Sequence, residues 1–350
     1  MSSASINYSK LLRSDLRRIL ETSTSEGKVF APVRRLEEYI NDYELRNPDE
    51  QELEETGDIT VVRSEKIPIT SLKPIECEIP VVAVDASVAV LGETDVGVIA
   101  AFKCAVVYSM NDRRPEVFRY VAHLTERNRD VYVRLRRLLS TSTATKSRPP
   151  KCSLSRMPYR LMNLLERITQ RYASTQICDG IVLWDGSMTR TKETSADIYR
   201  GSIRLARRYG NSIIAVSKRT RLRLSTGEKL NMLLDLERRP CFMEVHDLLP
   251  NSIKKDLMGR VFAVKFTANG FTFRVDVVPS RGMEYTDVLG RLMGATSFVH
   301  GYPEPLAKAH IYAYFTRNEV TALQAHVMDR YTLKQTDVFD IRAHILGPFG

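Results

Sequence analysis

The sequence predicts an α/β fold in which a mixed sheet, an antiparallel meander plus parallel strands, is flanked by helices. Three apolar runs at 81–91, 96–108 and 117–124 are joined by short polar turns, which is typical of an antiparallel meander. Beyond them, strands alternate with amphipathic helices up to residue 217, an order that favours parallel strands joined by crossover helices. A chain of 350 residues, 43% of them hydrophobic, can bury the core of one large domain or of two smaller ones.

The composition excludes several classes of protein. No run of eighteen apolar residues occurs, and the N-terminus lacks the layout of a signal peptide, so we expect no membrane association. Five scattered cysteines without CxxC spacing argue against a zinc ribbon or a secreted disulfide framework and predict a cytoplasmic protein. Neither a GxxxxGK(S/T) phosphate loop nor a GxSxG elbow is present. The net charge of +10 is compatible with a polyanionic partner.

The chain divides into three expected parts. Residues 1–78 form an N-terminal helical segment, with helices predicted at 5–24 and 32–46, followed by an acidic patch at 49–55. That patch is either a solvated face or a docking surface for a basic partner. Residues 79–320 form the core, and residues 321–350 a C-terminal helical tail.

Within the core, the remaining elements follow from hydrophobic periodicity. Helices are predicted at 131–140, 153–175, 195–209, 284–296 and from residue 305 onward, and strands at 180–185, 211–217, 261–267 and 271–278. Asn269-Gly270 between the last two strands indicates a hairpin. The cationic, Ser/Thr-rich segment 140–151 is expected to be an exposed loop, either a phosphate-contacting element or a plain linker.

Two carboxylates in apolar strands are the most informative residues. Asp85 interrupts the apolar run 79–91, and Asp185 ends the strand at 180–185. A charge in a buried strand is costly unless it is paired, and a divalent cation is one adequate partner. If the two strands are neighbours, both carboxylates can bind one magnesium or manganese ion. The alternative is that Asp85 ends its strand and caps a turn formed with Ala86 and Ser87.

Two further side chains can join this site. Glu166 lies on the helix that should pack against the sheet, and it is either a third acidic ligand or a boundary residue of an amphipathic stripe. His310 follows Leu306 by one helical turn and should face inward, either as a buried core histidine or as a metal ligand or proton-transfer group. Metal ions held by carboxylates suit phosphate-ester hydrolysis. Lys218, Arg219 and Arg221 would then contact the backbone of a nucleic acid.

Four segments, taken in order, resemble a known family. They are Val-Ala-Val-Asp85-Ala-Ser, Leu-Trp-Asp185-Gly-Ser, Ala-Val-Ser217-Lys218 and Gly301-Tyr302-Pro-Glu-Pro-Leu-Ala-Lys-Ala-His310. Together they are similar to the NurA nucleases of archaea over about residues 79–315. Departures from the family are Ala-Ser, where Gly-Ser often follows the first aspartate, and an apparent insertion at 140–151.

The resemblance implies an RNase H-like core and a manganese-dependent nuclease, with magnesium as a possible substitute. Such enzymes degrade single-stranded DNA and resect duplex ends with 5′-to-3′ polarity in double-strand-break repair, as dimers working with the hexameric HerA translocase. By position, Asp85, Asp185 and, less securely, Glu166 match the metal-binding acids, and Tyr302 and His310 match the catalytic residues of the final block. Lys218 matches a lysine that we expect to contact DNA. Two alternatives stay open: a catalytically weak DNA-binding or adaptor subunit that regulates a translocase, and an RNase H-like enzyme that acts on RNA.

Overall fold

The computed structural model describes residues 6–25, 59–61, 68–94, 96–109, 113–140, 152–191, 194–218, 220, 222–224, 232 and 234–330. Five features predicted from the sequence lie wholly or largely outside these residues. They are the helix at 32–46, the acidic patch at 49–55, residues 141–151 of the cationic loop, the tail beyond residue 330, and the pair Arg219 and Arg221.

A nine-stranded mixed sheet forms the centre of the described structure. In spatial order its strands are β2 (Thr70–Ser71), β9 (Cys241–Glu244), β10 (Arg260–Lys265), β11 (Phe273–Val278), β7 (Ser212–Ser217), β6 (Ile181–Asp185), β3 (Val81–Thr94), β4 (Gly97–Tyr108) and β5 (Glu116–Thr125). β6 pairs in parallel with both β3 and β7, whereas β3, β4 and β5 form an antiparallel meander. The predicted combination of a meander and parallel strands is confirmed.

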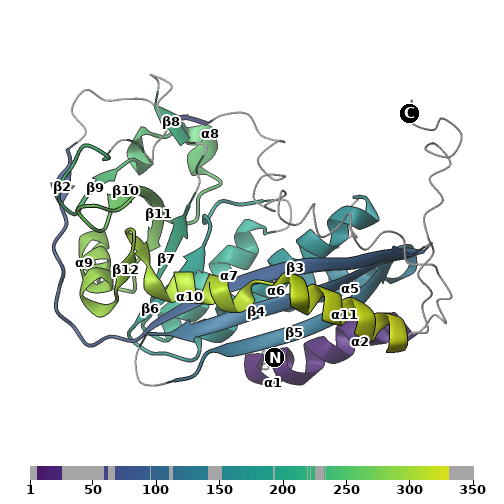
Figure 1. Cartoon of the computed structure of the whole chain (residues 1–350). Helices are drawn as coiled ribbons and strands as arrows, with labels where there is room; N and C mark the ends of the chain where they lie inside the picture. The colour runs from purple at the N-terminus through teal and green to yellow at the C-terminus, as the bar shows by residue number, and fades with distance from the viewer. Residues whose placement is uncertain are drawn as a thin grey trace, which may run out of the picture.

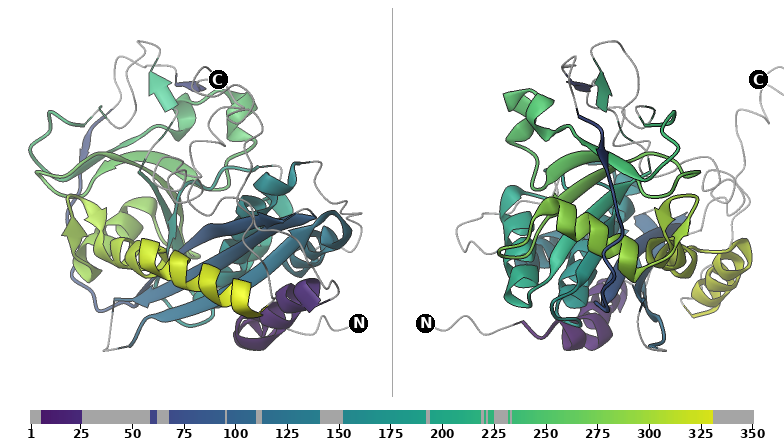
Figure 2. Two further views of the ribbon diagram at one scale, coloured as in Figure 1. Left: turned by 45° about the vertical axis from the view of Figure 1, so that its right-hand side comes forward. Right: turned by 90° about the vertical axis from the view of Figure 1, so that its left-hand side faces the viewer.

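Helices cover both faces of this sheet (Figures 1 and 2). On one face lie α5 (Asp130–Leu139), α6 (Met157–Ser174) and α7 (Ala196–Arg208), and on the other lie α9 (Tyr285–Ala295) and α10 (Glu304–Ala313). Successive side chains of a strand point to opposite faces. In β3, Val82 and Val84 therefore join the core under α6, and Val81 and Ala83 join the core under α10. This alternation decides which face each functional residue occupies.

Helical segments near both ends of the described chain pack onto the same sheet. α1 (Tyr8–Lys10), a π-helical turn (Leu11–Asp15) and α2 (Leu16–Ser25) form one continuous helical segment, as predicted for 5–24. Its leucines are buried in the α6-side core, and the Tyr120 hydroxyl of β5 donates a hydrogen bond of 2.7 Å to the Leu12 carbonyl. α11 (Arg317–Arg330) covers the far end of β3 and β4 through a small apolar cluster that includes Val320.

Smaller elements complete the fold. They are β1 (Ile59–Val61), β8 (Leu222–Leu224), α8 (Asn251–Lys254), β12 (Phe298–Val299) and β13 (Tyr302–Pro303). β10 and β11 form the expected antiparallel hairpin, and residues 266–272 join them. Gly270 in this loop lies close to the β12–β13 turn, because a Cβ atom there would lie 2.8 Å from Gly301 Cα. No helix among the described residues is long and apolar enough to cross a membrane.

Candidate metal centre

Asp85 lies in the middle of a strand, which excludes its alternative role as a strand-ending cap. β3 continues to Thr94, and Asp85 stays in register opposite Ala105 of β4. Because its position alternates with Val84, the Asp85 side chain lies on the α10 face of the sheet. The residue is only 8% exposed, and Asp85 Oδ1 accepts a 2.8 Å hydrogen bond from the Ala86 amide. A buried carboxylate is thus fixed in place by the strand that carries it.

Asp185 is the last residue of β6 and reaches the same place from the neighbouring strand. Parallel pairing sets Val84 opposite Trp184, so that the residues that follow them, Asp85 and Asp185, lie side by side on the α10 face. The chain leaves the strand at Gly186, whose φ of 89° favours glycine. The Gly186 amide donates to Asp185 Oδ1 at 2.9 Å and to the Val216 carbonyl at 3.0 Å.

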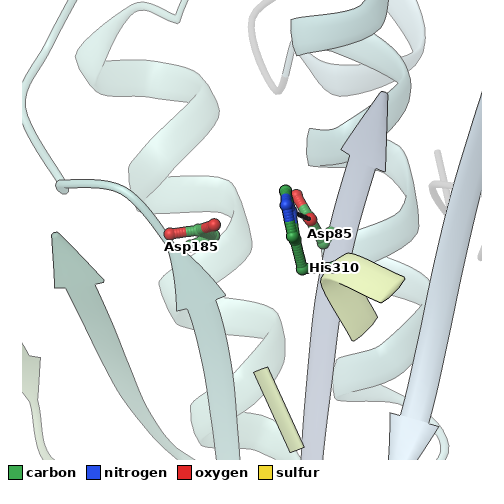
Figure 3. Close-up of side chains that lie close together, drawn as sticks. All are labelled: Asp85, Asp185 and His310. Atoms are coloured by element: carbon green, nitrogen blue, oxygen red, sulfur yellow. Dashed lines mark hydrogen bonds and ion pairs between the residues drawn. The ribbon is translucent and has the colours of Figure 1, made fainter. Parts of the chain in front are cut away.

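His310 approaches the aspartates from α10, as Figure 3 shows. Its Nδ1 lies 2.8 Å from Asp85 Oδ2. The prediction that His310 faces inward as a packed residue is wrong, since its side chain is 55% exposed. It lies on the rim of the site, because α10 buries Leu306, Ala309 and Ala313 instead. The hydrogen bond with Asp85 raises the pKa of His310 above its usual range, against the opposing effects of burial and of Lys218.

These three side chains are close enough together to bind one metal ion. One ligand atom from each of Asp85, Asp185 and His310 lies within 4.8 Å of the other two, and no other such group occurs among the described residues. Two carboxylate oxygens and one imidazole nitrogen suit divalent ions such as magnesium or manganese. The donor set therefore fits the type of ion that the sequence predicted.

Lys218 and Tyr302 stand beside this cluster. Lys218 follows β7, the other parallel neighbour of β6, and its Nζ lies 2.8 Å from Asp185 Oδ2. The same ammonium lies 5.1 Å from the centroid of the Tyr302 ring, which is 8% exposed and packs beside Phe273. The Tyr302 ring therefore makes a cation–π contact with Lys218. Lys218, predicted from the sequence as a nucleic-acid contact, is in this structure the ion-pair partner of a candidate metal ligand.

Glu166 is not brought into the cluster. It is 8% exposed on α6, and its Oε1 accepts a 2.8 Å hydrogen bond from Gln170. α6 packs on the face that carries Val84 and Trp184, whereas Asp85 and Asp185 point to the opposite face. The expected convergence of Glu166 with the two aspartates is not observed.

A buried ion pair next to the site was missed in the sequence. Arg274 and Asp276 of β11 are bound through two hydrogen bonds of 2.8 and 2.9 Å, and their side chains are 8% and 1% exposed. Asp276 accepts a 2.8 Å hydrogen bond from the Met188 amide, and Arg274 donates a 3.0 Å hydrogen bond to Thr189 Oγ1. The pair thus holds the loop that follows Asp185. Its signal was present, since the apolar strand reads Phe-Arg-Val-Asp-Val-Val.

The fold and the site together define an α/β protein with a carboxylate-based candidate metal centre. The model of the NurA domain matches residues 80–315, most of the chain. The chain therefore belongs to the NurA family, as the sequence motifs predicted. The mixed sheet flanked by helices that the sequence predicted is the sheet described above.

Solved structures that are similar to this chain include two of NurA and one of an endonuclease V. The crystal structure of the NurA nuclease from Sulfolobus solfataricus superposes with a TM-score of 0.49 at 14% identity, over 84% of this chain and 93% of that one. A second crystal structure of NurA gives 0.45 at 11% identity, over 83% and 96%. The catalytic domain of human endonuclease V gives 0.36 at 14% identity, over 75% and 92%. A search of curated proteins finds no match.

Proposed function

We propose that this protein is a divalent-metal-dependent deoxyribonuclease that hydrolyses phosphodiester bonds. The observation that carries the proposal is the convergence of Asp85, Asp185 and His310 in a chain of the NurA family. A site of this kind needs anionic oxygens, access for a polymer and a group that exchanges protons. The 55% exposure of the His310 side chain supports access from solvent.

Asp85, Asp185 and His310 would hold the metal, with manganese as the proposed ion and magnesium as a possible substitute. A bound divalent ion supplies positive charge that polarises the phosphate and lowers the pKa of water. The Ala86 and Gly186 amides orient the two carboxylates, because each donates to one oxygen and leaves the other oxygen directed into the site. Glu166 has no part in this ligand set.

The other site residues have roles that follow from their contacts. Because Nδ1 of His310 is hydrogen-bonded to Asp85, Nε2 is the ring nitrogen left either to bind the metal or, in a site where it binds none, to exchange a proton with the substrate. Lys218 is 42% exposed and carries a cationic charge next to Asp185, where it can contact the phosphate of the substrate. Tyr302 keeps the lysine in place through ring contact.

The finer features of the proposal rest on the family. They are degradation of single-stranded DNA, resection of duplex ends with 5′-to-3′ polarity in double-strand-break repair, a homodimer, cytoplasmic location, and action with a hexameric HerA-like translocase. The two competing functions, an adaptor subunit with weak activity and an enzyme acting on RNA, predict different results in one assay.

The test uses end-labelled single-stranded DNA, duplex DNA, RNA and RNA–DNA hybrid, each with manganese or with a chelator. Wild-type protein should degrade DNA only with metal, and Asp85→Asn should lose the activity. Asp287→Asn serves as the control, because this acidic residue is exposed on α9. DNA binding without cleavage by the wild type would favour the adaptor, and preferential cleavage of RNA would favour the RNA enzyme. Equal cleavage by Asp85→Asn and wild type would refute the proposed site.

A further inference from the structure

A basic cleft lies between α7 and the adjoining ends of β10 and β11. Its volume is about 770 Å³, and Arg200, Arg204 and Arg207 of α7 and Arg260 of β10 contribute to its lining. The buried side of α7 consists of Ile198, Tyr199, Ser202 and Ala206, and this arrangement leaves the three arginines exposed along the cleft. The amphipathic character of the helix thus creates a row of guanidinium groups.

The cleft is separate from the candidate metal centre. α7 packs in the core that contains Trp184, whereas the next residue of the same strand, Asp185, points to the α10 face. Figure 1 shows α7 and α10 on opposite sides of the sheet. Val278 of β11 and Met258, which line the cleft, also belong to the α7 side. A ligand in the cleft would therefore contact none of the three metal-ligating side chains.

The charge of the cleft comes mainly from α7. Arg260 is already paired with Glu244 and Asp247, so it adds little net charge. Asp197 is the acidic residue in the lining, and the three α7 arginines outnumber it. Arg200 makes no ion pair or hydrogen bond with the described part of the chain, whereas the Arg207 Nε donates a 3.0 Å hydrogen bond to the Pro279 carbonyl. An anion in the cleft would therefore meet a net positive surface.

The spacing of these arginines indicates the shape of the ligand. Positions four and three residues apart on a helix rise by about 6 Å and about 4.5 Å, so the row extends for roughly 10 Å. A single phosphate ion cannot span that length, but successive phosphates of a nucleic-acid strand can. The lining also includes Ile203 and Met258, which offer apolar contacts to sugars or bases, and Tyr285, whose ring centroid lies 5.7 Å from the Arg260 guanidinium.

We propose that this cleft is a second nucleic-acid subsite, which binds the phosphate backbone of a DNA strand away from the metal centre. The ligand class rests on the proposed function, but the binding itself does not need catalysis. Such a subsite would contribute to affinity for long strands through counterion release, and Arg200 and Arg204 would each neutralise one phosphate.

The test measures binding of a fluorescein-labelled oligothymidylate by anisotropy in chelator, so that no cleavage occurs. Wild type, the double variant Arg200→Gln/Arg204→Gln and the control Arg208→Gln are compared between about 50 and 200 mM salt. Arg208 is exposed on the same helix but does not line the cleft, so its variant controls for the lost charge. Two lost phosphate contacts should make the slope of log K against log salt less negative by about 1.4, whereas Arg208→Gln should leave it unchanged.

Between about 50 and 200 mM salt, the fold-loss of DNA affinity of the double variant should therefore be about sevenfold smaller than that of the wild type. The proposal is overturned if the double variant keeps the wild-type slope and affinity, or if Arg208→Gln changes the slope as much per charge. Circular dichroism confirms that each variant is folded. The outcome is independent of the nuclease assay. A double variant with the wild-type slope refutes only the proposal that the cleft binds DNA. Absence of metal-dependent cleavage by the wild type refutes only the proposed function.

Discussion

Replacing Arg274 tests whether the buried ion pair holds the loop behind the metal centre. In Arg274→Met, Asp276 loses both guanidinium hydrogen bonds while its side chain remains 1% exposed. One contact survives, the hydrogen bond from the Met188 amide. The variant therefore leaves a buried, charged carboxylate without its counter-charge, which is one of the few single changes expected to be severely destabilising.

The magnitude follows from that burial. Breaking a buried ion pair costs about 3–5 kcal/mol, and the surviving Met188 contact places this case near about 3 kcal/mol. An unfolding entropy of about 2.1 cal/mol/K per residue, taken over the chain, converts this cost into a fall in Tm of about 4 °C. The double variant Arg274→Met/Asp276→Asn should recover part of the loss, because asparagine can still accept from Met188 but has no charge to desolvate.

The assay is chemical denaturation together with manganese titration. Arg190→Met is the matched control, since Arg190 lies in the same loop and pairs with Asp256 at 2.8 Å, with side chains 47% and 30% exposed. A surface pair of this kind should contribute at most about 1 kcal/mol. Arg274→Met should also weaken manganese binding more than Arg190→Met does. A cost for Arg274→Met no larger than that for the control, with unchanged metal affinity, would refute the reasoning.

Three further predictions concern the metal centre directly. Glu166→Gln should retain a cleavage rate within about tenfold of wild type, whereas kcat of Asp85→Asn should fall at least about a hundredfold. Equal losses in the two variants would show that Glu166 is a metal ligand after all. Manganese affinity can be measured calorimetrically from about pH 8 to about pH 5.5. It should fall as the pH drops through the raised pKa of His310, because the protonated ring cannot bind metal. An affinity that does not change with pH would exclude His310 as a ligand. Lys218→Met should increase manganese affinity severalfold without DNA but reduce cleavage, and weaker metal binding would contradict this reasoning.

The meeting of Asp85 and Asp185 could be predicted only on the condition that their strands are neighbours, because β4, β5, α5 and α6 lie between β3 and β6 in the chain. Once the two strands pair in parallel, equivalent positions lie side by side. Side chains also alternate between the two faces of the sheet along each strand, and this alternation decides on which face each carboxylate lies. The Lys218 contact depends on the same rule, since β7 is the next parallel strand.

Glu166 and His310 show where such rules are insufficient. Periodicity placed Glu166 on a helix against the sheet but could not decide which face of the sheet that helix covers. His310 was expected on the helical stripe of Leu306 and Ala313, but α10 buries Ala309 between those two residues, so the His310 ring lies beside the buried stripe and at the rim of the site. Each of these depends on contacts between segments that are distant in the sequence.

The charges at the centre explain how metal and substrate can depend on each other. Each aspartate already has a cationic or potentially cationic partner, His310 for Asp85 and Lys218 for Asp185. His310 can become a ligand by losing a proton, whereas Lys218 offers its ammonium to Asp185 as an ion-pair partner. A divalent ion held by the aspartates would repel the nearby Lys218 ammonium, because both groups are positively charged. A phosphate placed between the two cations would relieve that repulsion, so DNA and metal should bind cooperatively through Lys218.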